Sequence, residues 1–121
     1  MNQNQKNALK ELYNNLIRAF DVQDLGDCAD KLQDILKTER DYLKSLPKGE
    51  VYLKEANESQ KAIDKLEKAD AAIFDVLNEF EEYEIGGAFA AMVGNNSELR
   101  ALFKENVQFA SVCIDEILKG I

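Results

Sequence analysis

Histidine is absent from this 121-residue chain, and proline, glycine and cysteine are scarce. Without imidazole, the chain cannot use histidine as a general base or as a metal ligand. One proline and six glycines are few for a β-fold with many tight turns, so helices are favoured. No run approaches the roughly 18 consecutive apolar residues of a membrane-spanning helix, and the polar N-terminus lacks the apolar segment of a signal peptide. We therefore expect a cytoplasmic protein, in a bacterial or host cell, with no membrane partner.

The two cysteines, Cys28 and Cys113, are far apart in the chain, and each falls on an apolar stripe. They lack the spacing of a disulfide framework or of a metal site. Isolated cysteines of this kind are more often small core residues than ligands or disulfide partners. The sequence therefore predicts two core cysteines and no bound cofactor.

The length and composition indicate a single domain over residues 1–121. With 45% hydrophobic residues, a chain of this length buries roughly two-thirds of its unfolded surface, which is enough for a core without staples. The net charge of −8 is unevenly spread, because residues 49–84 hold eleven acidic and four basic residues, a net charge of −7. This charge disfavours direct nucleic-acid binding and favours a partner with a basic surface.

Apolar residues recur at steps of three and four over most of the chain, the spacing of one face of an α-helix. The pattern predicts an all-α bundle of four long helices plus a short one. Gly26 suits the position after a helix end and Asp27 suits the next N-cap, so the first two helices are expected to form an antiparallel hairpin. The predicted helices span residues 5–23, 27–45, 50–84, 88–93 and 97–119.

The third predicted helix is long for a domain of this size. Residues 50–84 would extend about 50 Å at 1.5 Å per residue, whereas a domain of this length is about 30–35 Å across. Either the helix kinks around residues 56–59, or one end projects and packs against another copy of the chain. The helix over 97–119 is apolar around most of its circumference, which indicates a central place in the bundle or burial by an assembly.

The end of the third predicted helix carries a run of acidic residues without a lysine or arginine between positions 75 and 84. Carboxylates near a helix C-terminus oppose the helix macrodipole. One interpretation is a solvated face; the other is a surface for a basic partner or a cation, with Tyr83 as an aromatic anchor. The candidate partner-binding residues are Asp75, Glu79, Glu81, Glu82, Tyr83 and Glu84.

Residues 85–94, IGGAFAAMVG, are uncharged, small and apolar. No strand precedes this glycine-containing segment and no GKS/T motif follows it, so a phosphate-binding loop is not indicated. Small residues allow close packing of another helix, and an apolar segment that the monomer leaves uncovered indicates a contact with another molecule. The candidate oligomer contacts are Ile85, Phe89, Met92 and Val93.

Two patterns of acidic residues have spacings that can occur in metal sites. Aspartates recur at positions 21, 24, 27, 30 and 34, but a predicted helix break lies among them and two suit capping roles. The pairs Glu79/Glu82 and Glu81/Glu84 have the i,i+3 spacing that all-α nucleotide pyrophosphohydrolases use to hold Mg²⁺. Such an enzyme needs further carboxylates from a second helix, for which Asp115 and Glu116 are the candidates, and basic residues near the site. We therefore rank a metal-dependent hydrolase below a non-enzymatic function.

Residues 38–73 contain ERDYLKSLP followed by GEVYLKEANESQKAIDKLEKADAAI. This helix–proline turn–helix segment resembles small acidic helical proteins encoded by bacteriophages and mobile elements. The resemblance implies that the gene belongs to a phage or mobile element. In that setting we expect an inhibitor of a host nuclease or defence complex, because such targets carry basic grooves that an acidic protein could bind. The expected function is therefore a protein–protein interaction module, and the alternative is a self-assembling structural or assembly factor.

Overall fold

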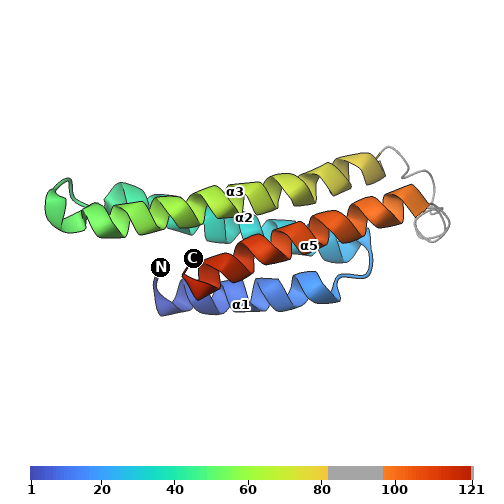
Figure 1. Cartoon of the computed structure of the whole chain (residues 1–121), viewed down its shortest axis with the longest axis horizontal. Coiled ribbons are helices and arrows are strands. Elements are labelled where there is room, and N and C mark those ends of the chain that lie inside the picture. The colour runs from blue at the N-terminus through green and yellow to red at the C-terminus, as the bar shows by residue number, and fades with distance from the viewer. Residues whose placement is uncertain (82–96, 121) are drawn as a thin grey trace.

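A computed structural model describes residues 1–81 and 97–120 of the chain. The described residues form four long helices and no strand, so the predicted all-α class is confirmed (Figure 1). A single 3₁₀ turn precedes the third long helix, and the predicted short helix over 88–93 lies outside the described residues. The elements are α1 (Gln3–Arg18), α2 (Val22–Ser45), η1 (Glu50–Tyr52), α3 (Leu53–Glu81) and α5 (Ser97–Lys119).

The four helices pack as a ring in which α1 contacts α2, α2 contacts α3, α3 contacts α5, and α5 contacts α1. Each helix turns its apolar stripe to the shared interior, as the period of three and four requires. Burial of these side chains is the main source of stability, because isolated helices of such lengths are marginal in water. The largest fully buried apolar side chains are Leu9, Leu12, Leu16, Leu25, Leu32, Leu66, Ile73, Val76 and Ile114.

The boundary between the first two helices differs from the prediction. The chain breaks at 19–21, and α2 runs through Gly26 without interruption. Asp21 caps α2, since its carboxylate accepts a hydrogen bond from the backbone N–H of Asp24 at 2.8 Å. The Asp24 carboxylate in turn accepts from the backbone N–H of Phe20 at 2.9 Å. This reciprocal pair resembles a capping box, and the N-cap of α2 is Asp21, six residues before the expected Asp27.

The third helix is continuous through residues 56–59. Its 29 residues extend about 43 Å, whereas the 16 residues of α1 extend about 24 Å. The turn from α2 into α3 consequently lies beyond the ends of α1 and α5 (Figure 1). Two apolar residues at this turn are largely exposed: Val51 is 81% accessible and Leu53 is 57% accessible.

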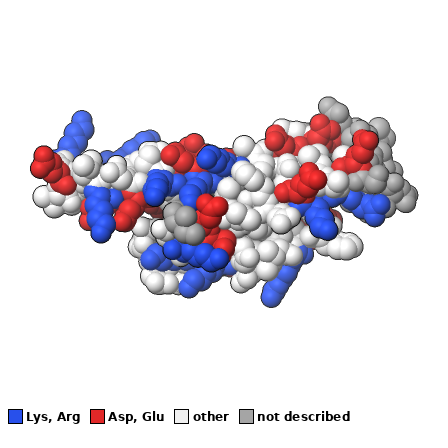
Figure 2. Space-filling model, in the orientation of Figure 1, with Lys and Arg blue, Asp and Glu red and all other residues white. Residues whose placement is uncertain are grey.

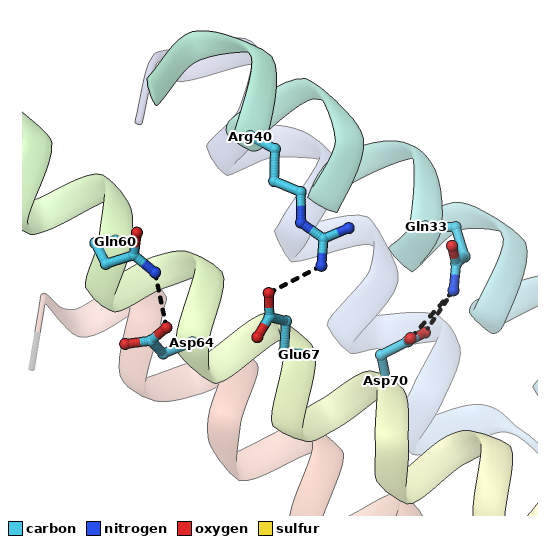
Figure 3. A network of polar contacts seen from close by, with 6 residues as sticks. All are labelled: Gln33, Arg40, Gln60, Asp64, Glu67 and Asp70. Carbon is cyan, nitrogen blue, oxygen red and sulfur yellow. Dashed lines mark hydrogen bonds and ion pairs between the residues drawn. The ribbon is translucent and has the colours of Figure 1, made fainter. Parts of the chain in front are cut away.

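Polar contacts join α2 to α3 on the outside of the bundle (Figure 3). Arg40 forms an ion pair with Glu67 at 2.8 Å, and the Gln33 amide donates to both carboxylate oxygens of Asp70 at 3.1 Å. Partial burial raises the pKa of Asp70, while the Gln33 hydrogen bond and the Arg40 charge act in the opposite direction. Exposed ion pairs contribute little, so these contacts chiefly fix the register of two helices that the core already holds together.

None of the helices in the described part of the chain has the length and apolarity needed to span a membrane.

Candidate functional site

The acidic end of α3 is only partly within the described residues. Asp75 and Glu79 are exposed and lie one helical turn apart, so both carboxylates project from the same side of α3. Neither forms an ion pair with a described residue. Glu81 belongs to α3, but its side chain is not described. The remaining predicted contacts, Glu82, Tyr83 and Glu84, lie outside the described residues, as do Ile85, Phe89, Met92 and Val93.

The basic residues nearest in level on α5 point away from this surface. Asn106 donates a hydrogen bond to the Ala72 carbonyl at 2.8 Å, which fixes α5 against this part of α3. Lys104 lines the opposite side of α5, in the groove that faces α1. Arg100 lies one turn earlier on that same side. Figure 2 shows acidic side chains toward this end of the molecule, with Lys and Arg side chains beside them.

No lysine or arginine lies in the last turn of α3 as described. The four lysines of the 49–84 stretch are at positions 54, 61, 65 and 68, so residues 69–81 of the helix contain none. Two carboxylates side by side without a cation repel each other and oppose the helix macrodipole by about a few tenths of a kcal/mol each. The arrangement is therefore slightly unfavourable for the isolated chain and favourable for contact with a cationic surface.

Within residues 1–81 and 97–120, the structure does not bring together the carboxylates that a metal-dependent hydrolase would need. Glu116 forms an ion pair with Lys65 at 2.9 Å, and Asp115 forms one with Lys119 at 2.8 Å. Because Glu116 lies beside Lys65, it is fourteen positions along α3 from Glu79, or about 21 Å. Asp115 and Glu116, the candidates on the last helix, therefore do not lie beside Asp75 and Glu79. Among the described residues, no group of three or more potential ligands could hold a metal ion.

The predicted aspartate ladder is likewise divided among other roles. Asp21 and Asp24 serve as capping residues at the start of α2. Asp30 and Asp34 are exposed on the outside of the same helix. Asp27, expected to be an N-cap, lies inside α2.

Both cysteines are free and buried, which confirms their predicted place in the core. Burial, with smaller contributions from the nearby Asp24 and Asp27 carboxylates, raises the pKa of the Cys28 thiol to about 11. Burial also raises the pKa of Cys113. Neither thiol is therefore set up as a nucleophile or as a metal ligand at neutral pH.

A groove of about 540 Å³ between α1 and α5 was not expected from the sequence. The helical period places Ile17 on the predicted inner stripe of α1, yet it is 56% exposed beside this groove. On α5, Phe109 is 50% exposed and Val112 is 49% exposed. The apolar circumference of the last helix is thus left partly uncovered within the monomer. Ile17 and Val112 line the groove together with Tyr13, Phe103 and Val107, whereas Phe109 lies outside it.

Comparisons of the chain with protein-family models, with curated proteins and with solved structures gave no match.

Proposed function

We propose that this protein is a non-enzymatic protein–protein interaction module that binds a basic surface of a partner through the acidic end of α3. The observation that carries the proposal is the exposure of Asp75 and Glu79 on one side of the helix, with no described cation paired to either. The charge run continues in the sequence through Glu81, Glu82 and Glu84. Complementary charge accelerates association and selects partners more than it adds affinity.

The proposed contact set consists of these acidic residues together with Tyr83 as an aromatic anchor. Aromatic side chains supply much of the affinity at the centre of protein interfaces, while surrounding charges orient the encounter. In keeping with the resemblance of residues 38–73 to phage-encoded acidic proteins, the partner is a host nuclease or defence complex with a basic nucleic-acid groove. The protein would inhibit that partner by covering the groove, in the cytoplasm of a bacterial or host cell.

The proposal is tested by affinity capture from the native host with three forms of the protein as bait. In the test variant, Asp75→Lys and Glu79→Lys reverse the exposed pair on α3. In the control variant, Asp30→Lys and Asp34→Lys reverse an exposed pair of the same spacing on α2. The wild type and the control should retain the same basic protein, and the test variant should lose it. Equal retention by all three baits would remove the acidic end of α3 from the interface.

The test variant should remain folded. Lysine near the end of a helix complements the macrodipole, so its free energy of unfolding should be unchanged or higher by about a few tenths of a kcal/mol. Loss of binding with retained stability would separate a recognition role from a structural one. Reversal of Glu81 and Glu82 to lysine extends the same test along the acidic run.

Self-assembly is the second candidate function, and the exposed apolar side chains at the α2–α3 turn and on α5 favour it. Val51, Leu53, Phe109 and Val112 together leave apolar surface uncovered on two parts of the molecule. The 85–94 segment would add Ile85, Phe89, Met92 and Val93 to an oligomer contact. Light scattering at tens of micromolar protein tests this function, which requires a mass above that of the 13.7 kDa monomer.

We also infer that α1 and α2 form the antiparallel hairpin expected from the sequence. The Gln5 amide near the start of α1 donates to the Ile35 carbonyl in the second half of α2 at 3.1 Å. Glu11 forms an ion pair with Lys31 between the same two helices. Both contacts support opposite chain directions.

A further inference from the structure

A pocket lined by lysines lies on the molecule at a distance from the acidic end of α3. Its volume is about 510 Å³, within the range of small-molecule sites. Three separate helices supply its walls, since Lys6 comes from α1, Lys61 and Lys65 come from α3, and Lys119 comes from α5. Figure 2 shows Lys and Arg side chains grouped around the region where the two chain ends meet in Figure 1.

The charge of the lining differs from that of the whole chain. Four lysines face one carboxylate, Glu58, around the pocket, while the whole chain has a net charge of −8. Two of the four ammonium groups already have acidic partners, because Lys65 pairs with Glu116 at 2.9 Å and Lys119 pairs with Asp115 at 2.8 Å. Lys6 and Lys61 are exposed, and neither pairs with a carboxylate among the described residues.

The fold brings these cations together although like charges repel. Convergence of ammonium groups is unfavourable by electrostatics alone and becomes favourable when an anion lies between them. The Lys65 side chain is only 19% exposed, so its charge is less screened by solvent than those at the rim. The lining thus combines one half-buried cation, Lys65, with the exposed cations Lys6 and Lys61.

The remaining wall is apolar. Ala62, Ile117 and Leu118 line the same pocket, and Ala62 is buried against the bundle. A purely inorganic anion would make no contact with this apolar wall, whereas an organic group attached to the anion would cover it. Mixed linings of this kind suit ligands with a charged head and a less polar body.

From this placement we propose that the pocket formed by Lys6, Lys61, Lys65 and Lys119 binds a small organic phosphate. Lys6 and Lys61 contact the phosphate oxygens, Lys65 and Lys119 are shared between the ligand and their carboxylates, and the organic part lies on Ile117 and Leu118. Ammonium–phosphate hydrogen bonds are charge-assisted and form the main attraction. This site is independent of the proposed protein-binding surface at the end of α3.

Calorimetric titration at low ionic strength tests the site with three probes: ATP without magnesium, tripolyphosphate and adenosine. The wild type should bind ATP in a 1:1 ratio, bind tripolyphosphate more weakly and show no binding of adenosine. Combined Lys6→Gln and Lys61→Gln substitution should lower the ATP affinity about ten-fold. Matched Lys37→Gln and Lys44→Gln substitution on α2, which does not line the pocket, should leave the affinity unchanged.

A second measurement locates the ligand without any substitution. In the wild-type protein, ATP should shift the backbone amide signals of Ala62 and Leu118 and leave those of Asp30 and Asp34 unchanged. The proposal is overturned by absence of ATP binding, by an equal loss of affinity in both double variants, by adenosine binding as tightly as ATP, or by shifts confined to α2.

Discussion

The buried carboxylate of Glu39 on α2 accepts a hydrogen bond from the Ser59 hydroxyl on α3, with an oxygen–oxygen distance of 2.8 Å. Glu39 is 1% exposed and Ser59 is 2% exposed. A buried carboxylate is stable only when its oxygens have donors. The pair therefore joins the second half of α2 to the first half of α3, between the apolar core and the projecting turn.

Replacing Ser59 with alanine should lower the free energy of unfolding by about 1–3 kcal/mol, because the buried Glu39 loses its hydroxyl donor. Urea unfolding followed by circular dichroism measures the change. Ser45→Ala is the matched control, since the Ser45 hydroxyl donates to the Tyr42 carbonyl at an exposed position. A Ser59→Ala effect no greater than that of the control would show that the buried bond contributes little.

Replacing Gly26 with alanine should raise the free energy of unfolding by about 0.5–1 kcal/mol. Gly26 lies inside α2, and a β-carbon there would have no other atom within 4 Å. Alanine reduces the freedom of the unfolded chain and is the better helix former. Chemical unfolding gives the value directly. A loss of stability would instead favour the helix break at Gly26 that the sequence suggested.

Asp70 should make the free energy of unfolding vary with pH in the acidic range. Burial raises its pKa in the folded state, so the folded protein keeps this proton to a higher pH than the unfolded chain does. Its stabilising contribution is complete below the unfolded pKa of about 3.9 and is lost as pH rises through the folded pKa. Asp70→Asn keeps an acceptor for Gln33 and does not titrate. The unfolding free energy of this variant, relative to wild type, should therefore be higher at about pH 7 than at about pH 3; the same difference at both values would contradict the raised pKa.

The Cys28 thiol should be unreactive in the folded protein. With its pKa at about 11, only a small fraction is thiolate at about pH 8, and burial hinders access as well. In a Cys113→Ala background, iodoacetamide should modify Cys28 at least about 100-fold more slowly in buffer than in concentrated urea. Mass spectrometry measures both rates. Comparable rates would mean that the first turns of α2 open readily.

The stripe of Leu9, Leu12 and Leu16 shows what could be read from the sequence. Their spacing predicted a buried helix face, and all three are fully buried. Ile17 continues the same pattern but faces the groove beside α5, because its burial depends on where the neighbouring helix crosses. The helix break predicted at Gly26 is wrong. Asp21 and Asp24 cap the helix at an earlier position, and their hydrogen bonds outweigh the weak helix propensity of the glycine.

The candidate sites, like the helices, could be predicted from the sequence only in part. The exposure of Asp75 and Glu79 follows from their position opposite the apolar stripe of α3. The distance of Asp115 and Glu116 from that surface depends on the register of α5 against α3, which the sequence does not encode locally. The lysine pocket was also beyond sequence analysis, because Lys6, Lys61 and Lys119 are far apart in the chain and meet only when α1, α3 and α5 pack together.

The acidic end of α3 is the proposed recognition surface of this protein. Its most direct test is the association rate constant of the captured partner, measured over a range of salt concentrations for the wild type and for the Asp75→Lys, Glu79→Lys variant. We predict slower association for the variant, by about ten-fold at low salt, with the difference shrinking as salt screens the charges. Identical association rates at every salt concentration would contradict the account.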